Sequence, residues 1–303
     1  LTFITVDSDY TIAENSSITD VYLSGSGNIS ATGNSKNNTF FGNSGNNTYQ
    51  GNGGNDIIID TEGGNDTYIY NRGDGFDNIT DFGGNDTIQF GEGISVSDVI
   101  FTKHGNDLSI TFKNNIQGEI WVNNFFNNDN GYKIENFKFA DNTCLTDITQ
   151  YITGIDVDCD YNITEDSSIT NVRLSGNGNI SVNGNSKDNT FFGNSGNNTY
   201  QGNGGNDTIS DTEGGDDTYI YNIGDGNDTI TDFGGNDTIQ FGEGISASDV
   251  IFTKHDNNLS ITFKNNIQGE IWVNNFFNSD NGYKIENFKF ADNTCLTDIT
   301  QYI

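Results

Sequence analysis

The chain of 303 residues contains no proline and no methionine, and its 12 basic side chains are outnumbered by 43 acidic ones, which gives a formal net charge of -31. Without proline every residue keeps its backbone N–H, which suits an unbroken ladder of backbone hydrogen bonds. The scarcity of Lys and Arg argues against nucleic acid or an anionic membrane surface as a partner. No stretch approaches the roughly 18 apolar residues of a membrane-spanning helix. A charge this large opposes compaction unless a cation binds.

Cysteine is also scarce. The three cysteines are Cys144, Cys159 and Cys295, without a CxxC pair, so their pattern predicts neither a disulfide framework nor a zinc site. A disulfide between Cys144 and Cys159 would join the two halves of the chain and contribute about 3 kcal/mol in the chain-entropy model. The alternative is a set of buried or free thiols.

The chain consists of one unit that occurs twice. Residues 1–151 align with residues 152–302 without a gap and with 23 differences, 13 of which fall in the first 37 positions. For example, SITDVYLSGSGNIS at 17–30 returns as SITNVRLSGNGNIS at 168–181. Two interpretations stay open, a duplicated domain with natural ends or a piece of a longer tandem array. The missing methionine and the matching ends favour the array.

A shorter period of nine to eleven residues lies inside each unit. Turns such as GNGGND at 51–56 end in Asn or Asp, and a large apolar residue follows two positions later. Gly supplies the positive φ of tight turns, and Asn and Asp tolerate it best among the other residues. The pattern predicts short strands, each with one large side chain pointing inward. The polar positions are Asn38, Asn47, Asp56, Asp66, Asp77 and Asp86, and the apolar ones are Phe40, Tyr49, Ile58, Tyr68, Ile79 and Ile88.

Successive turns should alternate between the two edges of such a coil. We therefore expect positions 38, 56 and 77 to stack on one edge and positions 47, 66 and 86 on the other. Stacked carboxylates repel one another unless a cation lies between them. Calcium prefers six or more hard oxygen ligands in flexible loops. The acidic turns thus predict calcium ions that bridge neighbouring rungs. A ladder of amides without metal is the alternative, and it fits the first, Asn-containing rungs.

The turn sequences resemble the calcium-binding nonapeptide of the RTX (haemolysin-type) family, G-G-x-G-x-D-x-U-x. GNGGNDIII and FGGNDTIQF match it closely, whereas GNSGNNTYQ and GNSKNNTFF carry Asn in place of Asp. The preceding residues are similar to the lead-in rungs of such repeats, and the segment from SDVIFTKHGNDLSITFKNN to YKIENFKFADNT resembles the β-rich module that often follows them. The resemblance implies a right-handed parallel β-roll, calcium bound between turns and secretion before folding. It implies no catalytic activity.

We expect an all-β chain of two tandem units, each a parallel β-roll (β-solenoid) capped by a small antiparallel β-rich module. The first unit is residues 1–151, with the roll at about 17–90 and the cap at about 91–151. The second is residues 152–303, with the roll at about 168–241 and the cap at about 242–303. In the cap, alternation on either side of HGND predicts a hairpin, and SVSD predicts a single helical turn. The aromatic residues predict a packed core rather than a sugar-binding platform, and His104 and His255 are expected to be solvated turn residues.

The Asp-containing rungs are the predicted metal sites. The strongest sites are expected between Asp56 and Asp77 and between Asp66 and Asp86, with weaker sites at Asn38 and Asn47, because an amide carries no charge. Spacings of 10 and 11 residues around DTEGGND and NRGDGFD make the pairing of Asp56 with Asp77 less regular. The predicted ligands in the first unit are Asp56, Asp66, Asp77, Asp86, Asn47, Gly51, Gly53, Gly54, Gly64, Gly75 and Gly84, and those in the second are Asp207, Asp217, Asp228, Asp237, Asn198, Gly202, Gly204, Gly205, Gly215, Gly226 and Gly235.

These features predict a calcium-binding structural repeat of an extracellular or cell-surface protein of bacterial type, such as a fibre, sheath, stalk or adhesin array. It would fold and stiffen in extracellular calcium, because metal-binding energy is then folding energy. The expected partners are several Ca²⁺ ions per unit and further copies of the unit. The alternative is a calcium-dependent secretion and folding segment of a larger RTX toxin or hydrolase. We predict no enzymatic activity, and ice binding by the threonines at 39, 48, 67 and 87 is a more remote hypothesis.

Overall fold

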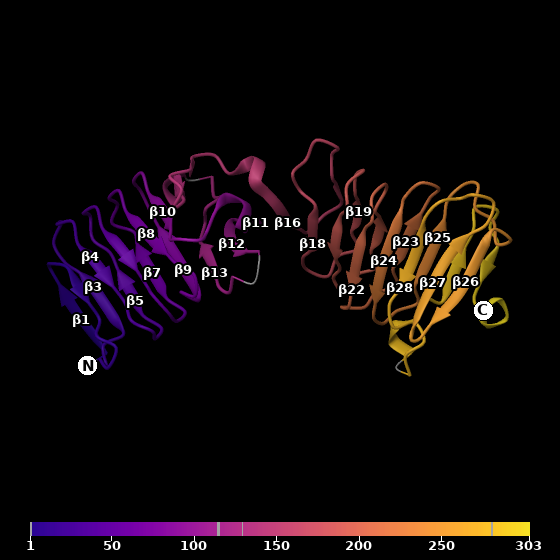
Figure 1. The fold of residues 1–303 in the computed structure, drawn as a ribbon, viewed down its shortest axis with the longest axis horizontal. Coiled ribbons are helices and arrows are strands. Elements are labelled where there is room, and N and C mark those ends of the chain that lie inside the picture. The colour runs from indigo at the N-terminus through magenta and orange to yellow at the C-terminus, as the bar shows by residue number, and fades with distance from the viewer. Residues whose placement is uncertain (1, 114–115, 129, 280) are drawn as a thin grey trace. The chain divides into compact units, whose positions relative to one another are not determined.

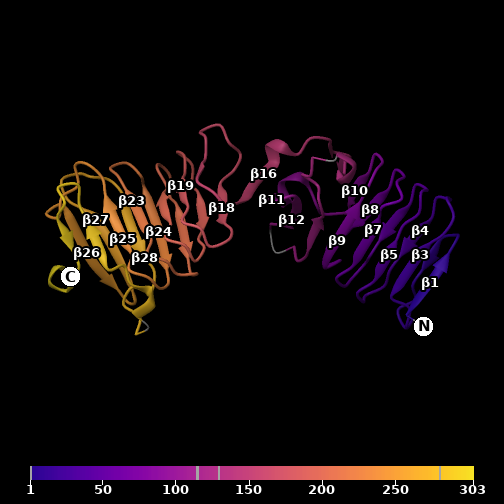
Figure 2. The ribbon, with the colours of Figure 1, turned by 180° about the vertical axis from the view of Figure 1, so that it is seen from behind.

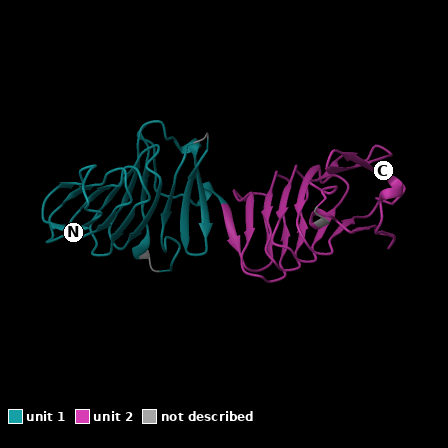
Figure 3. Ribbon diagram, turned by 90° about the horizontal axis from the view of Figure 1, so that it is seen from below, with its two compact units in different colours: residues 1–153 teal, residues 154–303 magenta. Residues whose placement is uncertain are grey.

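The computed structural model describes residues 2–113, 116–128, 130–279 and 281–303. The chain divides into two compact units, Leu1–Thr153 and Gly154–Ile303 (Figure 3). Both units are all-β, and the described ranges contain short 3-10 helices but no α-helix. One of them confirms the helical turn predicted at SVSD. The 3-10 helices are η1 (Val96–Asp98), η2 (Asn130–Tyr132), η3 (Thr149–Tyr151), η4 (Asn281–Tyr283) and η5 (Thr300–Tyr302).

Within the roll of the first unit, successive strands alternate between two sheets, as a coil of short strands and tight turns requires (Figure 1). Neighbouring strands within the roll are parallel, as predicted. In the first sheet the strand order is β1 (Phe3–Val6), β3 (Asp20–Leu23), β5 (Thr39–Phe41), β7 (Ile57–Asp60), β9 (Phe76–Asp81), β13 (Glu119–Val122), β12 (Asp107–Phe112), β11 (Val99–His104). In the second it is β2 (Tyr10–Thr11), β4 (Ser30–Thr32), β6 (Thr48–Gln50), β8 (Thr67–Tyr70), β10 (Thr87–Phe90), β14 (Asn136–Lys138), β15 (Cys144–Leu145).

The second unit repeats this arrangement, which Figure 2 shows from the opposite side. Its first sheet has the order β16 (Ile152–Val157), β18 (Asn171–Leu174), β20 (Thr190–Phe192), β22 (Thr208–Asp211), β24 (Asn227–Asp232), β28 (Glu270–Val273), β27 (Asn258–Phe263), β26 (Val250–His255). Its second sheet has the order β17 (Tyr161–Asn162), β19 (Ser181–Asn183), β21 (Thr199–Gln201), β23 (Thr218–Tyr221), β25 (Thr238–Phe241), β29 (Asn287–Lys289), β30 (Cys295–Leu296).

The predicted inward residues form two files at the centre of each roll, that is, two rows of stacked side chains, one from each sheet. In the first sheet Phe40, Ile58 and Ile79 lie opposite one another in register, and in the second Tyr49 lies opposite Tyr68. These side chains are at most 4% exposed. Burying a side chain of this size contributes about 1.5–3 kcal/mol. The sequence therefore predicted the core of the roll correctly.

The residues after the roll extend both sheets, which the prediction of a purely antiparallel cap missed. β13 pairs with β9 in parallel, with Val122 opposite Ile79, and β14 pairs with β10 in parallel, with Phe137 opposite Ile88. The predicted hairpin is present as β11 and β12, which pair antiparallel. Phe137 also contacts Phe101 edge to face at 5.4 Å, so the aromatic residues form the expected core. The module therefore contains both parallel and antiparallel strand pairs. Its parallel strands, β13 and β14, carry inward residues that continue the rows of inward side chains in the roll.

The parallel coil begins earlier than the expected position near residue 17. β1 already pairs with β3 in parallel, and β2 pairs with β4 in the same way. These first rungs lack the Gly-rich turns of the later ones, so their spacing does not mark them as part of the coil.

The prediction that the two histidines are turn residues was wrong, because each is the last residue of a strand and stacks on a tryptophan. His255 is exposed, as predicted for a solvated residue, whereas His104 is half-buried. His104 is the last residue of β11, its Nε2 lies 3.1 Å from Oγ of Ser109, and its ring stacks on Trp121 with centroids 4.9 Å apart. His255 stacks on Trp272 in the same way, at 5.3 Å. The error arose because each strand runs one residue further into HGND or HDNN than its alternation indicated.

Candidate metal centre

The turns form two ladders of Asn and Asp side chains, one on each edge of the roll. In both ladders the backbone N–H of one rung donates to the side-chain Oδ1 of the next rung, over 2.6 and 3.0 Å on one edge and 2.7 Å twice on the other. The spacing of the turns had predicted this stacking. We call the ladder of Asn38, Asp56 and Asp77 the Asp56 edge, and the ladder of Asn47, Asp66 and Asp86 the Asp66 edge.

A further carboxylate joins the Asp66 edge from the end of a strand. Asp81 is the last residue of β9 and begins the turn that ends at Asp86. One carboxylate oxygen each of Asp66, Asp81 and Asp86 lies within 4.8 Å of the other two, and the three side chains are at most 1% exposed. The second unit repeats the cluster with Asp217, Asp232 and Asp237.

The sequence analysis missed Asp81, although the sequence holds a signal for it. Alternate residues of a strand point to the same side. Since Ile79 points inward, the residue two positions later should do so as well, and Asp81 does. The same rule places Asp60 inside, two positions after Ile58, and Asp60 is 0% exposed.

Each carboxylate of the cluster keeps one buried oxygen without a hydrogen-bond partner. Oδ1 of Asp66 accepts the N–H of Asn47, and Oδ1 of Asp86 accepts the N–H of Asp66. The Oδ2 atoms of Asp66, Asp81 and Asp86 have no partner. A buried group left unsatisfied costs about 1–3 kcal/mol, and more when it is charged. In the second unit the unpartnered atoms are Oδ2 of Asp217, Oδ1 of Asp232 and Oδ2 of Asp237.

Burial raises the pKa of all three carboxyl groups. It raises the pKa of Asp66 to about 8 and that of Asp81 to about 9, and repulsion from Asp86 contributes to both. The pKa of Asp86 is raised by burial as well, with the charge of Glu135 adding to it. The cluster therefore takes up protons readily unless a cation balances its charge.

The donor set fits a calcium ion. Three carboxylates with unpartnered oxygens supply hard ligands, and neither nitrogen nor sulfur belongs to the cluster. A cation bound here would place positive charge beside Asp66, Asp81 and Asp86 and favour their ionised forms.

Two tyrosines orient the inner aspartates from within the roll. The hydroxyl of Tyr68 donates to Asp81, and the hydroxyl of Tyr49 donates to Asp60 at 2.6 Å. Asp60 also accepts from Nδ2 of Asn47 at 3.3 Å. Burial, together with the charge of Asp81, raises the pKa of Tyr68 well above its ordinary value. The hydroxyl therefore remains a donor, and the inner carboxylates are held by fixed partners.

The Asp56 edge has a different interior. Burial raises the pKa of Asp56 to about 7 and that of Asp77 to about 8. Their acidic neighbour Asp74 is occupied by the backbone N–H and the amide of Asn71, at 2.7 and 3.2 Å. Within the described ranges, no third acidic group forms a cluster with Asp56 and Asp77 like the one at Asp66. The strand-end position that holds Asp81 on the other edge holds Tyr70 here, whose hydroxyl donates to the carbonyl of Gly75 at 2.7 Å.

The predicted glycine ligands lie in the turns that carry the two ladders. A Cβ on Gly51 would lie 2.1 Å from Oδ2 of Asp56, and one on Gly84, with φ of 155°, would lie 1.7 Å from the carbonyl oxygen of Gly64. Only glycine lets neighbouring turns stack this closely, because a side chain at Gly84 would clash with the neighbouring turn. The close stacking brings the carbonyl oxygens of one turn near the next. The remaining predicted glycines share these turns: Gly53, Gly54 and Gly75, and in the second unit Gly202, Gly204, Gly205, Gly215, Gly226 and Gly235.

Asn47 uses both ends of its amide for hydrogen bonds within the protein, whereas Asn38 uses only its Oδ1, which accepts the N–H of Asn34. Asn47 is 1% exposed, its Oδ1 accepts the N–H of Ile29 at 3.1 Å, and its Nδ2 donates to Oδ1 of Asn43 at 3.0 Å. These contacts fit the amide-ladder interpretation of the first rungs. Asn198, the counterpart of Asn47, is likewise 1% exposed.

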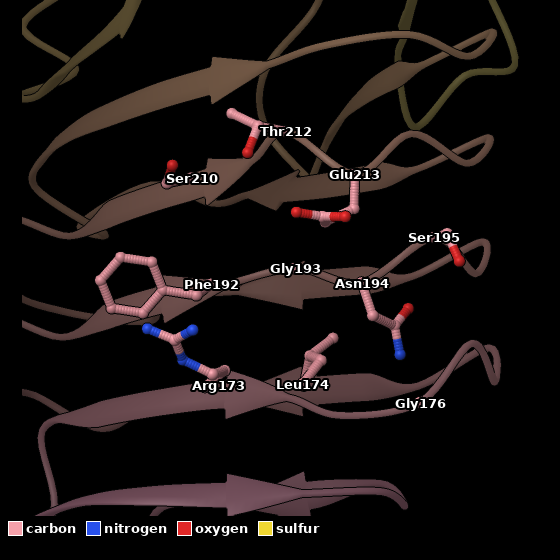
Figure 4. Close-up of a pocket in the computed structure, with 10 residues that line it drawn as sticks. All are labelled: Arg173, Leu174, Gly176, Phe192, Gly193, Asn194, Ser195, Ser210, Thr212 and Glu213. Carbon is pink, nitrogen blue, oxygen red and sulfur yellow. The ribbon is translucent and has the colours of Figure 1, made fainter.

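A cleft of about 300 Å³ lies on the outer surface of the second unit, over β18, β20 and β22 (Figure 4). The guanidinium of Arg173 lies over the ring of Phe192, 5.3 Å from its centroid. The first unit has Tyr22 in place of Arg173, and Tyr22 stacks on Phe41 at 4.3 Å. This outer surface therefore differs in chemistry between the two units, whereas the acidic cluster is the same in both.

The cysteines are free thiols. Cys144, Cys159 and Cys295 are all exposed and none forms a disulfide, which agrees with the free-thiol alternative. Among the described residues, no helix has the length and apolar character needed to cross a membrane.

Two family models match the chain. The haemolysin-type calcium binding protein related domain matches residues 107–148 and 258–299, and the RTX calcium-binding nonapeptide repeat matches residues 24–58, 175–209 and 213–246. No curated protein matches the sequence. Among solved structures, the extracellular lipase LipA from Serratia marcescens matches with 17% identity and a TM-score of 0.22. The match covers 82% of this chain and 38% of the lipase chain.

Proposed function

The chain belongs to the haemolysin-type (RTX) calcium-binding repeat proteins, and from this premise we propose that it is a calcium-stabilised structural repeat of a secreted or cell-surface protein. Its role would be mechanical, as part of a fibre, sheath, stalk or adhesin. The matched repeats are structural elements, and the proposal assigns no catalytic residue.

One observation carries the proposal. On the Asp66 edge three buried carboxylates each have one oxygen within 4.8 Å of the other two, and each has an oxygen without a hydrogen-bond partner. The second unit repeats the cluster at the equivalent positions. A protein gains nothing from such a cluster unless something neutralises it, because like charges in a dry interior repel strongly. We assign Asp66, Asp81 and Asp86 to a calcium site, and Asp56 with Asp77 to a weaker one.

Calcium would couple binding to folding. Without the ion the chain carries a net charge of -31 and several buried carboxylates that resist ionisation, so the folded state is disfavoured near neutral pH. With the ion the same carboxylates become ligands, and the binding free energy adds to the free energy of unfolding. A chain of this kind stays unfolded at low calcium and folds where calcium is plentiful.

A calcium titration followed by far-UV circular dichroism tests the proposal. Chelated protein at pH 8 should change from coil to β-structure at micromolar to millimolar calcium and respond little to magnesium. Magnesium demands a near-ideal octahedral site and dehydrates reluctantly, which makes it the matched control. A spectrum that is fully β-structured with chelator and unchanged by calcium would contradict the proposal.

A second candidate is a calcium-dependent secretion and folding segment of a larger toxin or hydrolase. The near-identity of the two units favours the structural role, since a secretion segment requires no copied unit. The full coding sequence separates the two: many 151-residue copies support an array, whereas a single catalytic domain beside these units supports the segment.

A further inference from the structure

The Asp66 edge does not end at its last aspartate. The backbone N–H of Asp86 donates to Oε2 of Glu135 at 2.8 Å. This contact continues the ladder, in which Asn47 donates to Asp66 and Asp66 donates to Asp86, each over 2.7 Å. Glu135 lies 49 residues beyond Asp86 and belongs to the module after the roll.

The backbone around Glu135 has the geometry of a rung. The N–H of Thr87 donates to the carbonyl of Asp66 at 2.9 Å, and the N–H of Asn136 donates to the carbonyl of Asp86 at the same distance. In the strand register Asn136 lies opposite Thr87. Since Asp86 directly precedes Thr87 and Glu135 directly precedes Asn136, Glu135 occupies the ladder position of the next rung.

The turn before Glu135 also stacks on the turn before Asp86. The N–H of Gly83 donates to the carbonyl of Gly131 at 2.7 Å, and the ring of Phe82 contacts that of Tyr132 edge to face at 4.9 Å. The sequence NGYKIE at 130–135 contains no nonapeptide motif, so only the fold reveals this turn as a further rung.

The rung next to Glu135 carries buried carboxylate oxygens without hydrogen-bond partners. Asp86 is 0% exposed and Asp81 is 1% exposed, and each has an Oδ2 without a partner. Glu135 adds a carboxylate at the next rung, where it accepts the N–H of Asp86, and its charge raises the pKa of Asp86 further. A cation beside Asp86 and Glu135 would favour the charged forms of both carboxylates.

We propose that Glu135 is a calcium ligand and, with Asp86, forms a further divalent-cation site between the last repeat of the roll and the module that follows it. Glu286 and Asp237 form the same site in the second unit, where the N–H of Asp237 donates to Oε2 of Glu286 at 2.9 Å. The inference rests on the proposed calcium-binding function. The ion at this site fastens the module to the roll, so the module folds only when the roll is loaded.

Isothermal titration calorimetry on the full chain tests the proposal by measuring how many calcium ions bind per unit. The variant Glu135→Gln with Glu286→Gln keeps an amide oxygen as acceptor for the aspartate N–H but loses the charge. The matched control is Glu92→Gln with Glu243→Gln, which makes the same change of net charge at exposed positions. The test variant should bind one ion fewer per unit, and the control should bind as many as the unchanged chain.

Each outcome has one meaning. If the test variant binds as many ions as the control with equal affinity, Glu135 is only a hydrogen-bond acceptor and the inference is overturned. If the unchanged chain binds no calcium, the proposed function fails first and the inference fails with it. Should the double variant not fold at saturating calcium, Glu135→Gln alone leaves the second unit intact, and it should lose one ion relative to the unchanged chain.

Discussion

The two edges of the roll share one backbone ladder and differ in what lies behind it. On the Asp66 edge, β7 and β9 end in an acidic inward residue, Asp60 and Asp81. On the Asp56 edge it is aromatic, Tyr70 in β8 and Phe90 in β10, and both are buried. The hydrogen bonds along the ladders are nearly identical.

We infer from this difference that the Asp of the nonapeptide does not alone decide the strength of a site. An aromatic residue behind the ladder fills space and stabilises the roll without metal. An aspartate there adds a charge that would destabilise the calcium-free roll and would supply one more ligand to a bound ion. We infer that the Asp66 edge is the calcium-dependent edge and that the Asp56 edge is the more constitutive one.

The largest expected effect comes from pH, because protonation acts on every buried carboxylate at once and removes the difference between the edges. Burial raises the pKa of Asp56 to about 7, of Asp66 to about 8 and of Asp81 to about 9, from an ordinary value near 4. Their contribution to the stability of the calcium-free chain is therefore greatest below about pH 4 and is lost as the pH rises through 7 to 9.

Urea unfolding of calcium-depleted protein measures this dependence. The midpoint should be higher at pH 5.5 than at pH 9, and saturating calcium should reverse the order. A calcium-free midpoint that rises with pH would show that the carboxylates are not buried as described.

Removing the inward aspartate at the strand end should make the Asp66 edge behave more like the Asp56 edge, with weaker calcium binding and a more stable calcium-free state. In the variant Asp81→Asn with Asp232→Asn, the calcium concentration at half-folding should rise about tenfold or more, and each tenfold corresponds to about 1.4 kcal/mol. Without calcium the same variant should be more stable than the unchanged chain, since a repelling charge is gone.

The matched control for this change is Asp77→Asn with Asp228→Asn on the Asp56 edge. This variant also removes one negative charge per unit, but on an edge where the inward residue at the strand end is Tyr70 rather than an aspartate. The calcium concentration at half-folding should therefore shift less. Equal shifts in the two variants would mean that the edges do not differ in calcium binding.

Two tyrosines allow a smaller test of the same comparison. Tyr68 donates to the carboxylate of Asp81, whereas Tyr70 donates to the backbone carbonyl of Gly75. Hydrogen bonds to charged groups contribute about 1.5–3 kcal/mol and neutral ones about 1 kcal/mol. In thermal unfolding with calcium, Tyr68→Phe should cost more than Tyr70→Phe. The reverse order would indicate that Asp81 is neutral in the loaded protein.

The smallest effect is expected on the outer surface. The copies differ at 23 positions, and among the described residues only the pair Ala31 and Val182 is buried in both. Arg173→Tyr gives the second unit the residue of the first. It should change the free energy of unfolding by no more than about 0.5 kcal/mol and leave the calcium midpoint unchanged. A clear loss of calcium affinity would place the cleft of Figure 4 within the metal-binding machinery.

The sequence by itself determined the repeat, the rhythm of strands and turns, the inward apolar files and the stacking of Asn and Asp on two edges. These features are local: a tight turn needs Gly and Asn at fixed positions, and a nine-residue period sets the register of the next rung. The calcium-binding character follows from the same motif, and the family models agree with it. Asp81 could also have been found, because it follows the inward Ile79 by two positions.

Only the tertiary structure decided how far the coil extends and where the Asp66 edge ends. β1 lacks the motif that marks a rung, and β13 and β14 pair with strands more than 40 residues earlier in the chain. Such pairings depend on which inward side chains fill the files of the roll, and no local period encodes them. Glu135 reaches the ladder for this reason: the fit of Phe137 against Ile88 fixes the register of β14, and that register places the glutamate beside Asp86.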